Sequence, residues 1–214
     1  MIFTRSIPPE QFKQYESYKP YLRKDFEYCC AYCLRPETNF GGEACGEIDH
    51  LCPQSVDEGL VCEYTNLYWS CRECNSNKGG IWPSAEEMAV GKGFVDPCND
   101  DLLEHYIFED TGKITTLSSL GEYSVDAMLL WRDSLVNWRR DSIEAFKEII
   151  RIEALLQNPT ISVEVREAYR HVLNGYKKAI SPPIFSRARR RDRPTPKSTS
   201  TAIKNSRPRK NRTS

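Results

Sequence analysis

Two Cys-x-x-Cys pairs give this sequence its clearest chemistry. Cys30 and Cys33 form the first pair, Cys71 and Cys74 form the second, and residues 34–70 separate them. Thiolates at this spacing are typical of two zinc knuckles that close on one tetrahedral ion. Cys29 adjoins the first pair, but the two-residue spacing favours Cys30 as the partner of Cys33. We therefore expect a structural zinc site, and the alternative is four unrelated buried thiols.

Polar residues between and just after these pairs form a second group. Asp49 and His50 end a predicted short strand, and Asn66 begins a second predicted extended segment. Asn75 and Lys78 lie in a predicted short helix. If these elements surround one metal ion, their side chains come close together in space: Asp49, His50, Asn66 and Asn75. The alternative is a structural zinc module in which the Asp-His pair makes hydrogen bonds at the strand end and the asparagines cap turns.

The order of these motifs resembles the zinc-knuckle branch of the HNH endonuclease family. That family has a ββα-metal fold and cleaves nucleic acid, and the resemblance covers residues 26–83. It departs from the family pattern at Asn75, where many members carry histidine.

The resemblance implies a role for each polar residue. Phosphodiester hydrolysis needs a base for the attacking water, and a histidine side chain, with an unperturbed pKa of about 6.5, is suited to that task. His50 is then the general base, and Asp49 and the side-chain oxygen of Asn75 hold a catalytic Mg²⁺ or Mn²⁺. Asn66 orients the histidine ring, and Lys78 contacts a phosphate of the nucleic acid.

Several other candidates have weaker signals. Glu47 precedes Asp49 by two residues and shares its strand face, so a role in assisting the metal stays open. His105 could reach the active site from the predicted hairpin, but its aromatic neighbours favour a structural role. Four further cysteines have no partner at ligand spacing and are interpreted as small buried hydrophobes: Cys45, Cys52, Cys62 and Cys98.

The rest of the chain predicts an α+β protein whose nuclease core is followed by a small hairpin and a helical hairpin. Residues 1–25 form a lead-in with a helix over 11–18 that Pro20 ends, and 26–83 form the nuclease domain. In residues 84–180, strands over 105–108 and 113–117 precede a long helix from Ser124 to 158 and a second helix over 162–180. The two helices are expected to pack against each other in antiparallel fashion.

Charge is distributed unevenly along the 214 residues. Lysine and arginine total 30 and aspartate and glutamate total 30, so the formal net charge is zero. Residues 181–214 carry eleven basic side chains against the single Asp192, which is +10, and the remainder therefore carries −10. We interpret 181–214 as a disordered basic tail, either an electrostatic arm for nucleic acid or a solubilising end.

Composition narrows the class further. No apolar run is long enough to span a membrane and no secretion signal opens the chain, so a cytoplasmic location is expected. Nine cysteines, an odd number, fit metal ligation better than a disulfide framework.

The second half is also similar to the HNH nucleases of Septu-type anti-phage systems, through Phe94-x-Asp-Pro97, a hairpin with Gly112 and a long arginine-bearing helix. This resemblance implies a separate partner ATPase subunit. Our interpretation is a metal-dependent HNH endonuclease with DNA as the favoured substrate. The alternative is a catalytically silent zinc module that binds nucleic acid or scaffolds a partner.

Overall fold

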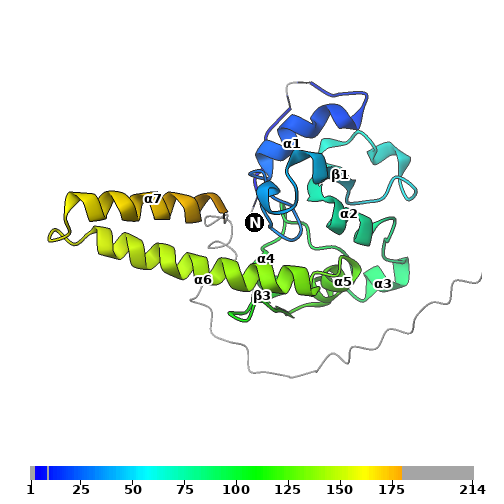
Figure 1. Cartoon of the computed structure of the whole chain (residues 1–214). Helices are drawn as coiled ribbons and strands as arrows, with labels where there is room; N and C mark the ends of the chain where they lie inside the picture. Colours follow the sequence, from blue (N-terminus) through cyan, green and yellow to red (C-terminus); the bar gives the residue numbers. More distant parts are fainter. Residues whose placement is uncertain (1–2, 9, 180–214) are drawn as a thin grey trace, which may run out of the picture.

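A computed structural model describes residues 3–8 and 10–179 of the chain (Figure 1). The predicted basic tail, 181–214, lies outside the described residues. None of the helices in the described part is long and apolar enough to cross a membrane.

The first half is built around a two-stranded antiparallel sheet. Strand β1 (Gly46–His50) pairs with β2 (Leu67–Cys71), and helix α2 (Arg72–Lys78) follows β2 directly. The register places Gly46 opposite Cys71 and His50 opposite Leu67. Gly46 has a packing role, because a Cβ atom there would lie 2.0 Å from the Trp69 ring. Strand, strand and helix therefore come in the predicted order, and α2 begins three residues earlier than expected.

The lead-in differs from the prediction. A 3-10 turn, η1 (Tyr15–Tyr18), runs into helix α1 (Lys19–Asp25), and Pro20 lies in the first turn of that helix. The prediction that Pro20 ends a helix was wrong, because proline fits the first helical turn, where no backbone N–H is needed. Four more 3-10 turns connect the elements around the sheet: η2 (Glu37–Asn39), η3 (Glu43–Cys45), η4 (Glu58–Leu60) and η5 (Tyr64–Asn66).

The second half contains short helices, a hairpin and two long helices. Helices α3 (Ala85–Ala89) and α4 (Leu102–His105) precede strands β3 (Tyr106–Phe108) and β4 (Ile114–Thr116), which pair as the predicted hairpin. Helices α5 (Ser119–Ala127), α6 (Asp133–Leu156) and α7 (Val163–Ala179) follow. Small sheets and many helices together agree with the predicted α+β class.

The long helix expected from Ser124 to 158 is broken in two. Leu129 has a φ of 50°, and the Leu130 N–H bonds the Val125 carbonyl at 2.9 Å, which ends α5. The Arg132 guanidinium then donates to the carbonyls of Met128 and Leu129 at 3.1 and 3.2 Å. Such a side-chain cap satisfies carbonyls that a continuous helix would have used internally.

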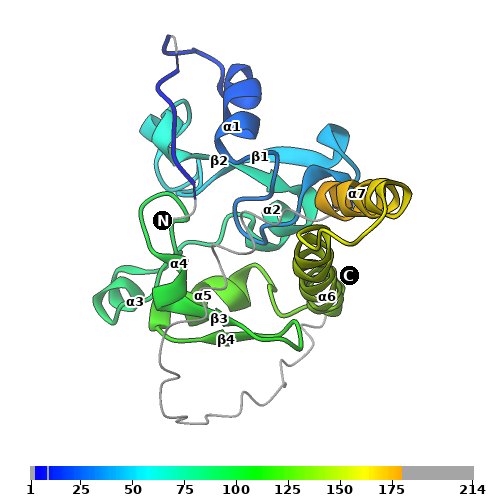
Figure 2. The same cartoon turned by 90° about the vertical axis from the view of Figure 1, so that its left-hand side faces the viewer.

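Two hydrophobic cores follow from this arrangement. The larger one joins α1, β2, α5 and the start of α6, with Leu22, Trp69, Val125 and Leu135 among its buried residues. The smaller one, Ile149, Ile152 and Leu173, holds the far half of α6 against α7. Figure 1 shows these two helices leaving the body side by side as an arm, and Figure 2 shows them nearly end-on.

Candidate metal centre and active site

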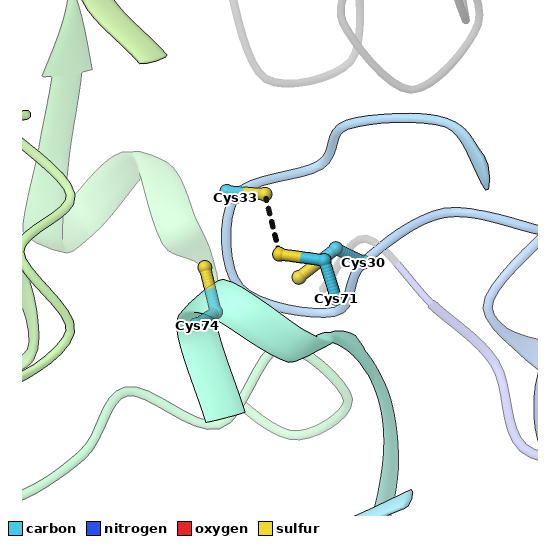
Figure 3. Close-up of side chains that lie close together, drawn as sticks. All are labelled: Cys30, Cys33, Cys71 and Cys74. Carbon is cyan, nitrogen blue, oxygen red and sulfur yellow. Dashed lines mark hydrogen bonds between the residues drawn. The ribbon is translucent and has the colours of Figure 1, made fainter. Parts of the chain in front are cut away.

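The four knuckle cysteines meet at one point. Their sulfur atoms all lie within 4.8 Å of one another and all four residues are buried (Figure 3). The Cys33 and Cys71 sulfurs are 3.9 Å apart. A tetrahedral zinc with Zn–S bonds of about 2.3 Å needs sulfur separations of about 3.8 Å, so the cluster can hold a metal ion such as zinc.

Backbone hydrogen bonds position each knuckle. The Leu34 N–H bonds the Cys30 carbonyl at 2.9 Å, and the Ala31 N–H bonds the Trp69 carbonyl of β2 at 2.8 Å. Leu34 has a φ of 64°, which closes the tight turn. The second pair lies where β2 passes into α2, with Cys71 at the N-cap. The sheet therefore fixes both halves of the centre.

Two arginines lie against the sulfurs. Arg35 is 3.8 Å from the Cys71 sulfur and Arg132 is 3.4 Å from the Cys74 sulfur. Both also pair with the Glu73 carboxylate. Four thiolates around Zn²⁺ carry a net charge of −2, which two guanidinium groups would offset. Arg132 follows α5 in the chain, so this contact also ties the second half to the metal centre.

A buried ion pair occupies the face of β1 that α2 covers. The Lys78 ammonium is 3.1 Å from the Asp49 carboxylate and 2.6 Å from the His50 carbonyl oxygen. The Tyr32 hydroxyl donates to the same carboxylate. Lys78 and Asp49 side chains are 0% and 4% exposed, and burial raises the pKa of Asp49. Lys78 was expected to contact a phosphate, but its ammonium is fully buried, so no phosphate can reach it in this arrangement.

His50 has its ring held from three sides. Its Nε2 lies 2.9 Å from the Val61 carbonyl oxygen, which can only accept a hydrogen bond. Nε2 therefore carries the proton of the neutral ring, and Nδ1 keeps the basic lone pair. The Gln54 amide nitrogen lies over the ring, 3.2 Å from Nδ1 and 3.4 Å from Nε2, and the Tyr15 ring packs edge-on with a centroid separation of 4.8 Å.

Asn66 acts on the loop that carries these partners. Its Oδ1 accepts from the Cys52 N–H at 2.8 Å, and its Nδ2 donates to the carbonyls of Cys52 and Leu60 at 3.0 and 3.3 Å. We had expected Asn66 to hydrogen-bond the histidine ring. In the structure Asn66 instead hydrogen-bonds the backbone on both sides of the loop, and its orienting role stays a prediction.

Asn75 pairs with Glu47 rather than with Asp49. The Asn75 amide donates to Glu47 Oε2 at 2.8 Å, and Arg72 pairs with the other oxygen of the same carboxylate at 2.8 Å. Asp49 lies further along the strand, engaged by Lys78. As arranged, Asp49 and Asn75 do not present a shared open site for a divalent ion, because an ion at Asp49 would have to displace the Lys78 ammonium. The Mg²⁺ or Mn²⁺ site stays a prediction.

The remaining candidates lie apart from this cluster. His105 Nδ1 is 2.7 Å from the Ser118 hydroxyl at the start of α5, in agreement with a structural role. Cys52 and Cys98 are buried as expected, but Cys45 and Cys62 are only partly buried. Within the described residues, none of these four cysteines belongs to a metal-binding group.

Three groups that contact the histidine or its neighbours were not predicted from the sequence: Gln54, the Val61 carbonyl and Tyr32. Only Gln54 had a local signal, since it follows Pro53 and lies four residues after His50. A backbone carbonyl such as that of Val61 leaves no signal in side-chain identity. Tyr32 lies 17 residues from Asp49.

Comparison with known proteins gives one informative match. No protein-family model matches the chain. It is 30% identical over 186 residues to the Septu protein PtuB of Bacillus mycoides (strain KBAB4), a match that covers 75% of this chain and 61% of that protein. The chain thus has weak homology to PtuB and spans less than two thirds of the length of that relative.

Proposed function

We propose that this protein is a nuclease that hydrolyses phosphodiester bonds of nucleic acid, DNA being the favoured substrate, with His50 as its general base. The observation that carries the proposal is the ring geometry of His50. The Val61 carbonyl accepts a hydrogen bond from Nε2–H, so Nδ1 holds the lone pair that can accept a proton from water. A buried metal-binding cluster that fixes the adjacent strand and helix supports the same proposal.

The biological setting we propose is anti-phage defence. The similarity to a Septu protein supports it, and the resemblance of the second half to nucleases of that system adds a partner ATPase subunit. Zinc is the ion proposed for the cysteine cluster, because four buried thiolates are a preferred donor set for zinc.

The catalytic step is proposed from the residues of this chain alone. One proton of the attacking water passes to Nδ1 of His50, while Tyr15 and Val61 keep the ring in place. A divalent ion is expected from the family resemblance, but Lys78 occupies the Asp49 carboxylate in this arrangement. No part of the step is therefore assigned to the ion.

The alternative function is a silent zinc module that binds nucleic acid or scaffolds a partner. The observation that favours it is the same closed arrangement: His50 is only 8% exposed, and the Asp49 carboxylate is engaged by a lysine and a tyrosine.

Cleavage of supercoiled plasmid by purified zinc-loaded protein, with Mg²⁺, Mn²⁺ or EDTA, distinguishes the two. A general base is worth about 10²- to 10⁴-fold in rate, so His50→Ala should lose nearly all nicking. His171→Ala, on the exposed surface of α7, is the matched control and should cleave normally. Cleavage by His50→Ala at the wild-type rate would rule out the base, and no cleavage by the wild type, alone or with a co-purified ATPase, would favour the silent module.

A further inference from the structure

The break between helices α5 and α6, at residues 128–132, adjoins the metal-binding cysteines. Helix α5 ends shortly before Leu129, which has a φ of 50°, and α6 then carries the arm away from the body (Figure 1). Arg132, at the N-cap of α6, donates to two backbone carbonyls that follow α5 and also lies 3.4 Å from the Cys74 sulfur. One guanidinium therefore contacts both the helix break and the metal centre.

Helix α2 fixes the Arg132 guanidinium in this position. Glu73, in the first turn of α2, has its Oε1 2.8 Å from Arg132 Nε and its Oε2 3.1 Å from Arg132 Nη2. Two parallel contacts of this kind define the orientation of a guanidinium as well as its position. Asn77, on the same helix, donates to the Met128 carbonyl at 3.4 Å. The helix that carries Cys74 therefore also holds the α5–α6 break.

A second arginine of α6 is buried without a carboxylate beside it. Arg139 is only 1% exposed, and its guanidinium donates to two backbone carbonyls at 2.6 and 2.9 Å. In the part of the chain that the structure describes, its ionisable neighbours are Cys33, Cys74 and Arg132, with no acidic side chain among them. Burial lowers the pKa of Arg139 to about 10, and the two cysteines raise it, so Arg139 is a cation at neutral pH.

These guanidinium groups need negative charge nearby, because water no longer stabilises a buried cation. Glu73 supplies one negative charge, but it faces both Arg35 and Arg132. Four thiolates around Zn²⁺ carry a net charge of −2. The filled metal centre is therefore the remaining counter-charge for Arg132 and, at longer range, for Arg139.

We propose that Arg132 and Arg139 are outer cations of the metal centre, and that the filled centre thereby fixes the α5–α6 break from which the arm leaves. The linkage is reciprocal, because the free energy that the bound ion contributes to the break equals what an intact break contributes to ion binding. This inference does not depend on the proposed nuclease function, since no substrate and no catalytic group takes part in it.

Hydrogen exchange of the full-length protein over a series of free zinc concentrations tests the linkage. The Leu130 and Leu135 amides report on the break, and the Ala31 and Leu34 amides report on the first knuckle. Both sets should lose protection with the same zinc midpoint, and exchange should become about 10-fold faster or more in the emptied protein. Amides in the far half of α6, which packs on α7, are the internal control and should stay protected. Break amides that stay protected while the knuckle amides exchange would overturn the inference.

Cobalt(II) in place of zinc reports on the sulfurs directly, through the charge-transfer band from thiolate to metal. Without a guanidinium beside it a sulfur gives up electrons more readily, so the band should move to longer wavelength in Arg132→Met. It should stay close to the wild type in Arg132→Lys, which keeps the charge, and in Arg140→Met, at an exposed position. An unshifted band in Arg132→Met would overturn the inference, and this outcome decides also if the emptied chain unfolds as a whole.

Zinc affinity gives the reciprocal measurement. The Kd for zinc should rise about 10-fold in Arg132→Met, because the ion loses the contribution of an intact break. Arg139→Met should bind zinc more weakly than Arg139→Lys, which keeps the positive charge. Equal Kd values for the two Arg139 variants would overturn the part of Arg139 in the metal centre and assign it to packing.

Discussion

Replacing Lys78 by methionine should destabilise the protein more than any exposed charge change would. The ammonium lies 3.1 Å from the Asp49 carboxylate and 2.6 Å from the His50 carbonyl, and the Lys78 side chain is fully buried. At 3.1 Å, with an effective dielectric constant of about 20, the charge pair is worth about 5 kcal/mol before desolvation is subtracted. Removing one partner of a buried pair typically costs about 3–5 kcal/mol, because the other charge stays buried without compensation.

That loss is large against a typical domain stability of about 5–15 kcal/mol. For a chain of this size each kcal/mol shifts Tm by about 2–4 °C, so Lys78→Met should lower Tm by about 10 °C. The assay is urea unfolding and a thermal scan at a fixed free zinc concentration, with zinc content measured in parallel. Exposed Lys92, which pairs with Glu87 at 3.3 Å, gives the matched control, and Lys92→Met should change stability by less than about 1 kcal/mol.

A double variant tests whether the stability effects of Asp49 and Lys78 are coupled. Asp49→Asn removes the carboxylate charge while keeping an acceptor for the Tyr32 hydroxyl. The double variant Asp49→Asn, Lys78→Met should be more stable than the sum of the two single losses by about 2 kcal/mol or more. Purely additive losses, or a Lys78→Met protein as stable as the wild type, would refute the buried-pair argument.

Three further predictions follow from the same structure. Arg132→Met should weaken zinc retention against a chelator, because a guanidinium beside one of the four sulfurs is lost, whereas Arg140→Met, at an exposed position, should retain zinc normally. Gly112→Ala should lower the unfolding free energy by more than about 3 kcal/mol, because its Cβ would lie 2.0 Å from a carbonyl oxygen of α6. Gly91 has a similar positive φ but open space around the position of a Cβ, so Gly91→Ala should cost only about 1 kcal/mol. Burial raises the pKa of Asp49 above its ordinary value of 3.8. The folded state therefore keeps the carboxyl proton of Asp49 to higher pH than the unfolded state does. Stability should fall as pH rises from about 3.8 through the raised pKa of the folded state. Asp49→Asn should remove that slope in unfolding experiments, and an unchanged slope would assign it to another group.

The sequence by itself determined the four-cysteine cluster and the elements that carry it. Ligand spacing within each cysteine pair is a local property, so Cys30, Cys33, Cys71 and Cys74 could be paired without coordinates, and the structure brings them together. The hairpin around Gly112 and the α+β class were likewise predictable, since turn residues and apolar periodicity act over a few neighbours.

Only the tertiary structure decided what the polar residues of the site contact. Lys78 is an internal cation because α2 packs over β1 and buries its side chain, and Asn66 binds the loop backbone because that loop folds back on it. The contact between His50 and the Val61 carbonyl depends on the path of the loop between them. Local sequence preferences do not determine that path. Local spacing therefore determined which residues are present near the site, and long-range packing determined which atoms of those residues remain free to act.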